Sequence, residues 1–359
     1  MTEETIQTVL PYAPIPFRQA GKWTLAYETL LQNQTSRRWK LCEIKVTDTG
    51  SGRQISVWGE KEIAENSRFL QADYRPIEAE ALDAGLVQLV YHWPTYDERA
   101  DVPETLHHVF VLQDETGAGM QLETDVRVQQ IQAPVIRPPL LGEGWLAADA
   151  ATNFTGHRRT LIPVDGQPYF AQRYAVDWIR FGEDGMLVNG PAEKNECWYC
   201  YGAEIHAVAD GVITMTQDGI VENVALGAPV IKITWETAAG NLIIQDIGAG
   251  QYAFYAHLLP GSLTVKDGDH VRAGQVIARL GNSGNSDAPH LHFHIGNRNS
   301  PLGAQGIPYH FAAYRSTGIA GTTDEIMQRL TEGKPWENAQ APALREDEMF
   351  ASNEVVILE

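Results

Sequence analysis

The amino-acid sequence predicts an all-β protein built from two domains. Short segments in which apolar and polar residues alternate recur along the chain, and turns rich in Gly, Asp and Ser separate them. This pattern is typical of antiparallel sheets. The 359 residues are enough for two domains with a buried core each. A content of 43% hydrophobic and 20% charged residues is that of a globular protein and argues against wholesale disorder.

Residues 1–132 are expected to form an accessory β-sandwich of the immunoglobulin-like kind. Alternating segments and a hairpin-type turn at Asp48-Thr-Gly-Ser-Gly52 have the number and spacing of such a domain. The histidine pair His107 and His108 would point to opposite faces of a strand, so the two are poor joint ligands. The expected strands are 23–31, 39–46, 53–58, 87–93, 107–113 and 126–132.

The rest of the chain is expected to divide into an interdomain linker, a second β domain and a tail. A stretch rich in Pro and Gly indicates the linker. In the tail we expect one short helix around 324–330, with Thr322 or Thr323 as its N-cap, and a last strand at 355–358. The three segments are 133–145, 146–320 and 321–359, respectively.

Charge and hydropathy narrow the classes of partner. The formal net charge is −19, which argues against nucleic acid or an anionic membrane as the main partner, because binding phosphates requires clustered Lys and Arg. No run of eighteen apolar residues is present, so no transmembrane helix is expected. The N-terminus lacks the features of a signal peptide, which leaves a cytosolic protein or a mature form without its leader. The oligomeric state is not indicated.

The segment His290-Leu-His-Phe-His294 carries the strongest chemical pattern. With Ile295, its alternation predicts a strand with the three histidines on one face and Leu291, Phe293 and Ile295 on the other. Imidazoles are costly to bury without partners, and His is the commonest side-chain ligand of transition metals. The pattern therefore indicates a metal site or a proton-transfer site.

The three cysteines point to structural roles. Cys42 lies in an alternating segment and is expected to be a buried small side chain. Cys197 and Cys200 form one C-x-x-C motif without a second pair of soft ligands, so a zinc ribbon is not indicated. We expect these two residues to form a local disulfide or to be free thiols, outside the active site.

Several motifs occur in an order that resembles a known family. They are Asp177-Trp, Tyr255-Ala-His257-Leu and Gly281-Asn-Ser-Gly-Asn-Ser followed by Pro289-His-Leu-His-Phe293, with 207–211 and 267–275 between them. Over roughly residues 156–300 the sequence resembles the lysostaphin/LytM-type zinc endopeptidases of bacterial cell walls. The resemblance implies an antiparallel sheet of the duplicated hybrid motif type with the active site in a groove across it. It also implies one Zn²⁺ per chain, a peptidoglycan peptide as substrate and a location outside the cytoplasm.

The same resemblance implies roles for individual residues. Asp177 and His292 resemble the zinc ligands, and His257 and His290 resemble the catalytic pair that handles the proton and the developing oxyanion. The chemistry agrees, because the chain has no H-E-x-x-H motif whose glutamate would serve as the base. Histidine, with an unperturbed pKa of about 6.5, is the side chain best matched to that task at neutral pH.

The first ligand departs from the family pattern. Arg173 stands four residues before Asp177, where the commonest form of the motif has His, and arginine cannot bind a cation. We assign the role to His157, the nearest upstream histidine, because some relatives have an insertion at this point. His294 is expected to orient a ligand imidazole through a hydrogen bond, with a direct ligand role as the alternative. Tyr255 either reaches the groove, sharing a face with His257, or is a packed aromatic side chain.

Three functions compete at this stage. The first is a zinc metalloendopeptidase that hydrolyses peptide cross-links or bridges in peptidoglycan. The second is a catalytically degenerate cell-wall binder or hydrolase activator of the same fold, and His157 discriminates the two because two ligands alone hold zinc poorly. The third is a phosphocarrier with His257 and His290 as phosphoryl carriers, and Asp177 together with the His-x-His pair disfavours it.

Overall fold

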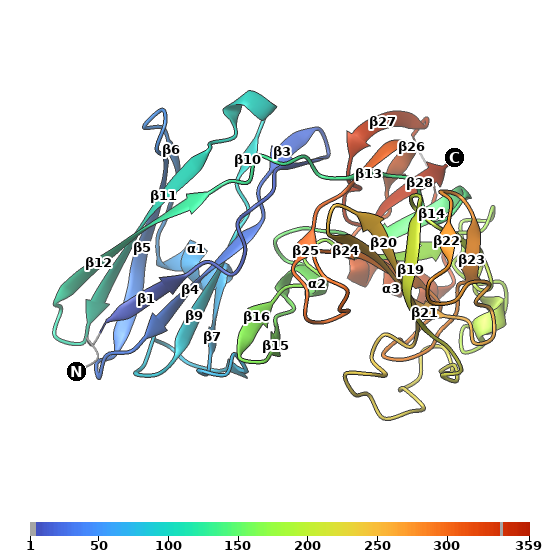
Figure 1. Ribbon diagram of the computed structural model, residues 1–359, viewed down its shortest axis with the longest axis horizontal. Helices are drawn as coiled ribbons and strands as arrows, with labels where there is room; N and C mark the ends of the chain where they lie inside the picture. Colours follow the sequence, from blue (N-terminus) through green and yellow to red (C-terminus); the bar gives the residue numbers. More distant parts are fainter. Residues whose placement is uncertain (1–4, 338–339) are drawn as a thin grey trace. The chain divides into compact units, whose positions relative to one another are not determined.

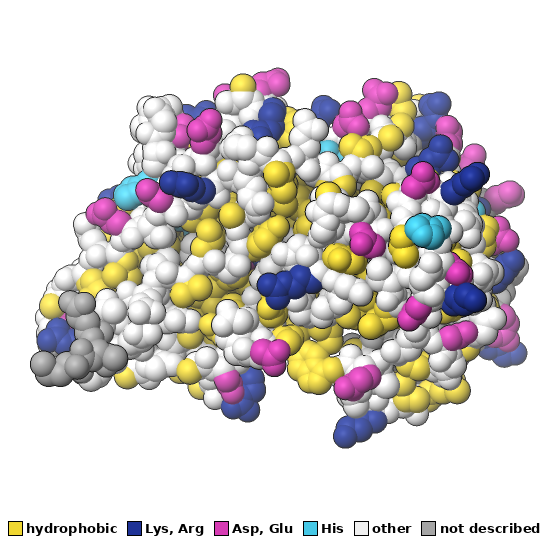
Figure 2. Space-filling model, in the orientation of Figure 1, with side chains coloured by type: hydrophobic (Ala, Val, Ile, Leu, Met, Phe, Trp, Pro, Cys, Tyr) yellow, Lys and Arg dark blue, Asp and Glu magenta, His cyan; other side chains and the backbone are white. Residues whose placement is uncertain are grey.

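The computed structural model describes residues 5–337 and 340–359, and most of the regular structure in these ranges is β. The chain splits into two compact units (Figure 1). The N-terminal unit comprises Met1–Ala133 and Leu161–Tyr169, and the C-terminal unit comprises Pro134–Thr160 and Phe170–Glu359. In the described part of the chain, no helix is long and apolar enough to cross a membrane. Acidic and basic side chains are interspersed on the face of each unit drawn in Figure 2.

The N-terminal unit contains two antiparallel sheets that share one core. The first has the order β1-β4-β9-β7-β8 and the second the order β12-β11-β5-β6. Leu31 and Val90 of the first sheet lie in the same hydrophobic cluster as Ile44 and Phe110 of the second. The strands are β1 (Ile6–Val9), β4 (Tyr27–Asn33), β9 (Val87–His92), β7 (Ser67–Leu70), β8 (Pro76–Ile77), β12 (Gly119–Arg127), β11 (Thr105–Asp114), β5 (Trp39–Asp48) and β6 (Gln54–Trp58).

The strand order matches the immunoglobulin-like arrangement. Taken along the chain as A, B, C, C′, D, E, F and G, the main strands give A-B-E-D in one sheet and G-F-C-C′ in the other. The strand expected at 126–132 is wrong, because β12 occupies Gly119–Arg127 as the hairpin partner of β11. The remaining elements are β2 (Phe17–Gln19), β3 (Lys22–Thr24), β10 (Thr95–Tyr96), α1 (Glu60–Glu65), the 3-10 turn η1 (Arg99–Asp101), and the hairpin of β15 (Ile162–Val164) and β16 (Gln167–Tyr169).

One twelve-stranded sheet dominates the C-terminal unit. Its order is β13-β26-β28-β14-β17-β24-β21-β20-β19-β22, with β25 beside β24 and β27 beside β26, and only the β13–β26 pair is parallel. The strands are β13 (Val135–Ile136), β26 (His310–Ile319), β28 (Glu354–Leu358), β14 (Gly142–Ala148), β17 (Val176–Arg180), β24 (Leu291–Gly296), β21 (Gln251–Leu258), β20 (Asn241–Gly248), β19 (Gly211–Gln217), β22 (His270–Val271), β25 (Gly306–Ile307) and β27 (Ala343–Glu348). Outside this sheet lie the pair β18 (Glu204–His206) and β23 (Val276–Arg279), α2 (Gly156–Arg159), the 3-10 turn η2 (Asn195–Cys197) and α3 (Thr323–Glu332).

The segments expected to be a linker and a tail are parts of this sheet. Segment 133–145 contains β13 and the start of β14, and β28 from the expected tail pairs with both β14 and β26. The glycines that suggested a linker instead mark an irregularity in the ladder between Gly142 and Trp145. Gly144 has φ +78° there, and a Cβ on it would lie 2.5 Å from the carbonyl oxygen of Phe181. Glycine is therefore required by a close strand contact.

The short helix α3 begins and ends as its sequence indicates. Thr322 is the N-cap and forms a capping box with Glu325, and Gly333 ends the helix with φ +62°. At the centre of the sheet, β17, β24 and β21 lie side by side, all antiparallel. The functional side chains project from these three strands and from the adjoining loops.

Candidate metal and catalytic site

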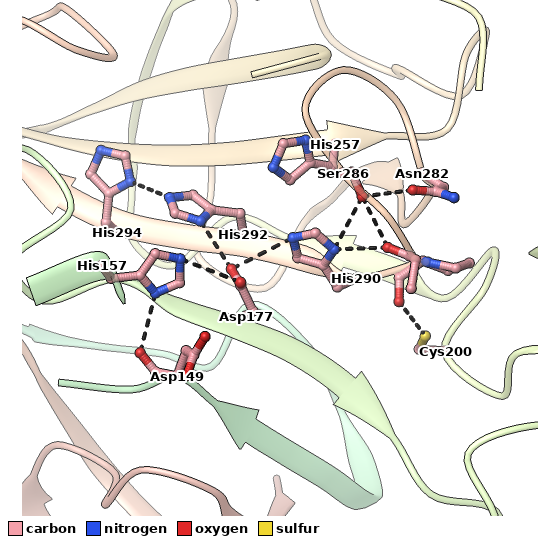
Figure 3. A network of polar contacts seen from close by, with 12 residues as sticks. Asp149, His157, Asp177, Cys200, His257, Asn282, Ser286, His290, His292 and His294 are labelled. Atoms are coloured by element: carbon pink, nitrogen blue, oxygen red, sulfur yellow. Dashed lines mark hydrogen bonds and ion pairs between the residues drawn. The ribbon is translucent and has the colours of Figure 1, made fainter. Parts of the chain in front are cut away.

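The central strand β24 presents its histidines on one face of the sheet. His292 and His294 project from this face, and His290 immediately precedes the strand. The apolar residues between them lie on the other face and are fully buried. Figure 3 shows His157, His290 and His292 around Asp177, with His294 beyond His292. The alternation read from the sequence therefore has the expected structural result.

Three residues from distant parts of the chain converge beside β24. Asp177 of β17 lies opposite His292 in the ladder, and its Oδ1 is 2.9 Å from Nδ1 of His292. His157 of α2 places Nε2 3.3 Å from Oδ2 of the same carboxylate. One potential ligand atom from each of His157, Asp177 and His292 lies within 4.8 Å of the others. We call these three residues the ligand group.

Hydrogen bonds orient both imidazoles of the ligand group. Nδ1 of His157 donates to the carbonyl oxygen of Asp149 at 3.1 Å, and Nε2 on the other side of the ring faces Asp177. Nε2 of His292 is 3.1 Å from Nδ1 of His294, which leaves Nδ1 of His292 toward Asp177. Each ring thus offers one nitrogen to the group and uses the other to fix its orientation, as metal-binding histidines usually do.

Opposite charges within the ligand group shift the pKa values of its members. Burial lowers the pKa of His157, but the charge of Asp177 and its hydrogen bond outweigh that effect and raise the pKa to about 9. Burial likewise raises the pKa of Asp177, yet the charges of His157 and His290 hold it well below its usual range. The carboxylate is therefore ionised and attracts positive charge. Its side chain retains 22% exposure against 6% for His292, so the group opens to solvent at Asp177.

A second histidine pair adjoins the ligand group. The ring centroids of His257 and His290 are 4.7 Å apart, and His257 is 5.9 Å from His292. Nδ1 of His257 donates to the carbonyl of Ser283, and Nδ1 of His290 donates to the carbonyl of Ala288, both at 2.8 Å. Because carbonyl oxygens only accept, each ring uses its Nδ1–H in this bond and leaves Nε2 for other contacts.

His257 is neutral and held in an unusual backbone conformation. Burial, followed by the charges of His290 and His292, holds the pKa of His257 well below its usual range. Its φ is +63°, a left-handed value that is rare for residues other than glycine, and such strain concentrates at functional sites. The conformation turns the side chain out of the alternation of β21 and toward His290.

This conformation corrects the expectation that Tyr255 shares a face with His257. Tyr255 lies opposite Phe293 on the other face of the sheet, with ring centroids 5.3 Å apart. Its hydroxyl donates to Oε1 of Gln245 at 2.7 Å and accepts from the backbone N–H of Val208 at 2.9 Å. Tyr255 is a packed aromatic residue and does not reach the site. Side chains of a strand normally alternate between its two faces, which would put Tyr255 and His257 on the same face. The left-handed backbone of His257 breaks this alternation.

Arg173 and His294 have different positions relative to the ligand group. The buried Arg173 donates to the carbonyl of Gly306 and to Oε1 of Gln305, each at 3.0 Å, and is not one of the ligand group. His294 stacks on Phe254 with centroids 4.5 Å apart. Burial holds the pKa of His294 well below its usual range, so the ring is neutral. Its position beside His292 fits the orienting role better than the direct ligand role.

Several residues make contacts at the site that their sequence pattern does not indicate. The hydroxyl of Ser286 lies 3.3 Å from Nδ1 of His290 and donates to Oδ1 of Asn282 at 2.6 Å. The thiol of Cys200 donates to the carbonyl of Pro289 at 3.1 Å. All three cysteines are free thiols, and Cys42 is half-buried, not buried as expected. Neither the contacts of loop 281–286 nor that of Cys200 follows from the spacing of these residues in the sequence.

Residues 199–303 match Peptidase family M23. This segment contains His257, His290 and His292, while His157 and Asp177 precede it. The match to this family covers less than a third of the chain. The resemblance to lysostaphin/LytM-type enzymes is confirmed over this M23 segment.

The similar proteins include a peptidoglycan endopeptidase and the catalytic domains of an M23 protein and an antimicrobial peptidase. The chain is 29% identical over 103 residues to the peptidoglycan DD-endopeptidase ShyA of Vibrio cholerae, a match that covers 29% of this chain and 20% of ShyA. Among solved structures, the M23 catalytic domain of EnpA from Enterococcus faecalis is 18% identical, with 48% of this chain and 92% of that one covered and a TM-score of 0.27. The catalytic domain of lysostaphin from Staphylococcus simulans is 27% identical, with coverages of 36% and 88% and a TM-score of 0.22. The family assignment rests on the sequence match.

Proposed function

We propose that this protein is a zinc-dependent endopeptidase that hydrolyses peptide cross-links or bridges of bacterial peptidoglycan outside the cytoplasm. One observation carries the proposal: His157, Asp177 and His292 each bring a ligand atom within 4.8 Å of the others, directly beside the pair His257 and His290. The M23 segment supports the peptidase class, and the similarity to a peptidoglycan DD-endopeptidase supports the substrate.

The donor set fits zinc. Two imidazole nitrogens and one carboxylate oxygen are the ligands of many catalytic zinc sites, which keep a further position open. When bound by His157, Asp177 and His292, zinc would lower the pKa of a water molecule to about 7 and polarise the scissile carbonyl. Because Asp177 is partly exposed, an ion held by these residues would be reachable from solvent.

The histidine pair is assigned to proton transfer and charge stabilisation. His257 is neutral with a free Nε2, so it is placed to accept a proton from the attacking water. Nε2 of His290 lies 3.6 Å from Oδ1 of Asp177 and faces the same region. In its protonated form His290 would hold the oxygen on which negative charge develops. The pair thus replaces the glutamate that H-E-x-x-H enzymes use.

The competing functions receive less support. A degenerate binder would lack the third ligand, whereas His157 completes the ligand group. A phosphocarrier would use the pair His257 and His290 without a carboxylate and a third imidazole beside it. We assign the N-terminal unit an accessory role in recognition or spacing.

Metal analysis combined with a cleavage assay tests the proposal. Purified protein is expected to contain about one zinc ion per chain and to release new amino termini from purified peptidoglycan, and both should be lost on chelation and restored by added zinc. Protein that holds no zinc, or that releases no amino termini from peptidoglycans of different cross-link type while holding zinc, contradicts the proposal.

A further inference from the structure

We infer that Cys200 is a positioning residue: its thiol holds the carbonyl of Pro289 and so fixes the peptide that presents His290 to the site. The inference rests on the proposed function for its activity readout. Nothing in the C-x-x-C motif or in the spacing of Cys200 from His290 indicates this contact. Figure 3 shows Cys200 on the side of His290 that faces away from the ligand group.

The contact is buried and directional. Cys200 is fully buried, and its Sγ lies 3.1 Å from the carbonyl oxygen of Pro289, within the range for a hydrogen bond from sulfur. A carbonyl oxygen only accepts, so the thiol donates. Burial raises the pKa of the thiol to about 12, so the proton that makes this bond is retained at any physiological pH.

His290 depends on such contacts because it stands outside the strand. The ladder of β24 begins at Leu291, so no ladder bond holds His290. The peptide between Pro289 and His290 has two hydrogen-bonding groups. Its N–H reaches the carbonyl of Gly281 at 3.3 Å, a long bond, and its carbonyl is held by Cys200. Rotation of this peptide would redirect the side chain of His290.

The two groups that bond this peptide, the Cys200 thiol and the Gly281 carbonyl, are linked to each other by backbone hydrogen bonds. Ala203 donates its backbone N–H to the carbonyl of Cys200 at 3.1 Å, and the N–H of Leu280 donates to the carbonyl of Ala203 at 2.9 Å. Leu280 directly precedes Gly281, the acceptor of the His290 N–H. The thiol and the Gly281 carbonyl therefore belong to one hydrogen-bonded network, which bonds both the N–H and the carbonyl of the Pro289–His290 peptide.

The same loop also supports the ring of His290. Asn195, five residues before Cys200, accepts from the amide of the buried Asn282 at 3.0 Å. Asn282 in turn accepts from the hydroxyl of Ser286, which lies against Nδ1 of His290. Loop 195–203 thus reaches the catalytic imidazole by two routes, one through the backbone at Pro289 and one through the ring. Among the contacts of the described residues, the Cys200 thiol is the only side-chain donor to the Pro289–His290 peptide.

Three variants test the role of the thiol. Cys200→Ala removes the donor, Cys200→Ser keeps a hydroxyl donor in nearly the same place, and Cys197→Ala removes the neighbouring half-buried thiol as a control. For Cys200→Ala we expect kcat to fall by about 10- to 100-fold, the effect of misplacing a reacting group by up to about 1 Å. KM and zinc content should stay at the parent values. Cys200→Ser should recover most of the loss, and Cys197→Ala should match the parent.

A second readout does not need activity. In protein labelled with ¹⁵N-histidine, the Nδ1–H signal of His290, assigned by its absence in His290→Gln, should shift and exchange faster with water in Cys200→Ala. It should be retained in Cys200→Ser and Cys197→Ala. Equal kcat in Cys200→Ala and the parent, or equal losses in the Ala and Ser variants, overturns the inference. If the parent itself cleaves nothing, the proposed function fails, and the ¹⁵N signal alone decides the role of Cys200.

Discussion

At the scale of single residues, the site depends on how each imidazole is anchored. Four of its histidines use one ring nitrogen for a fixed hydrogen bond and turn the other toward Asp177 or its surroundings. Three of these anchors are backbone carbonyls, of Asp149, Ser283 and Ala288. A carbonyl cannot change its donor or acceptor role, so the tautomers of these rings are set by the fold.

The assignment of His157 as a ligand predicts a specific loss of metal. His157→Ala removes one of three ligands, and two ligands hold zinc poorly. We expect zinc content measured by inductively coupled plasma mass spectrometry to fall from about one per chain to a small fraction after dialysis. His107→Ala, in the N-terminal unit, serves as the control and should keep full zinc. Full occupancy in His157→Ala would falsify the ligand assignment.

The catalytic pair should separate turnover from metal binding. His257→Ala and His290→Ala leave the ligand group intact, so both should retain zinc. Removing a positioned proton acceptor or oxyanion donor typically costs a factor of about 10²–10⁴ in rate. Release of amino termini from peptidoglycan, measured alongside zinc content, checks this. Parent-level cleavage by either variant would show that the mechanism is misassigned.

His294 should act on zinc affinity through His292. A ring nitrogen that supports a ligand imidazole is typically worth a factor of about 10–100 in metal affinity. His294→Leu removes this partner and should weaken zinc binding by that factor in a chelator competition. His294→Gln, whose amide oxygen can still accept from His292, should lose less. Identical affinities for the two variants would show that the hydrogen bond has no role.

At the scale of elements, the sheet brings together residues that are far apart in the sequence. The pairing of β17 with β24 sets Asp177 beside His292, and the pairing of β24 with β21 sets Phe254 beside His294. On its other side β17 pairs with β14, so the geometry of β14 is transmitted to Asp177. The glycine-rich start of β14 is therefore part of what holds the site.

Gly144 provides a test of this element. Gly144→Ala combines a left-handed φ with a Cβ 2.5 Å from the carbonyl of Phe181. The strain and the overpacking should together lower the free energy of unfolding by about 2–4 kcal/mol. Gly250→Ala has a similar φ of +71° with nothing within 4 Å, so it should cost only the backbone strain, about 1–2 kcal/mol. Chemical denaturation of both variants measures the difference, and equal losses would rule out the clash.

At the scale of the whole molecule, the two units are expected to respond to different solution conditions. The ligand group lies in the C-terminal unit, so chelation is expected to act there. The N-terminal unit instead contains a buried histidine, His108, which lies between Tyr27 and Leu106. Its Nδ1 donates to the Leu106 carbonyl at 3.3 Å, and its Nε2 accepts from the Tyr27 hydroxyl at 2.9 Å. Both bonds are satisfied only by the neutral ring.

His108 predicts that acid destabilises the N-terminal unit. Burial lowers its pKa to about 4, from about 6.5 in the unfolded chain. The unfolded state therefore binds a proton first as pH falls, and stability is lost progressively between pH 6.5 and 4. The loss from this group is about 2 kcal/mol between pH 6.5 and 5 at 1.36 kcal/mol per pH unit.

Denaturation midpoints measured at several pH values test whether acid destabilises the N-terminal unit through His108. His108→Gln keeps an acceptor for Tyr27 without titrating, so the loss of stability on acidification should shrink. His107→Gln removes the adjacent, half-exposed imidazole that bonds Asp125 and should leave the loss in place. A His108→Gln variant as acid-sensitive as the parent would exclude this residue as the cause.

Local sequence was sufficient for the parts of the protein that depend on local geometry. Alternation in His290-Leu-His-Phe-His294 predicted a strand and the face its histidines occupy, because side chains of a strand point to opposite faces in turn. Thr322 was one of the two N-cap residues predicted for α3, because a helix cap depends on residues within one turn. The all-β class followed from the same short-range periodicity, repeated along the chain.

Only the tertiary structure decided how distant segments meet. The ladder between β17 and β24 and the placement of α2 bring His157, 135 positions before His292 in the numbering, into the ligand group while Arg173 turns away to Gly306. The left-handed backbone of His257 separates it from Tyr255, which periodicity cannot show. The contact of Cys200 with Pro289 likewise joins loops that no spacing relates. These features depend on strand pairing and loop packing, in which each residue is placed by partners far away in the chain.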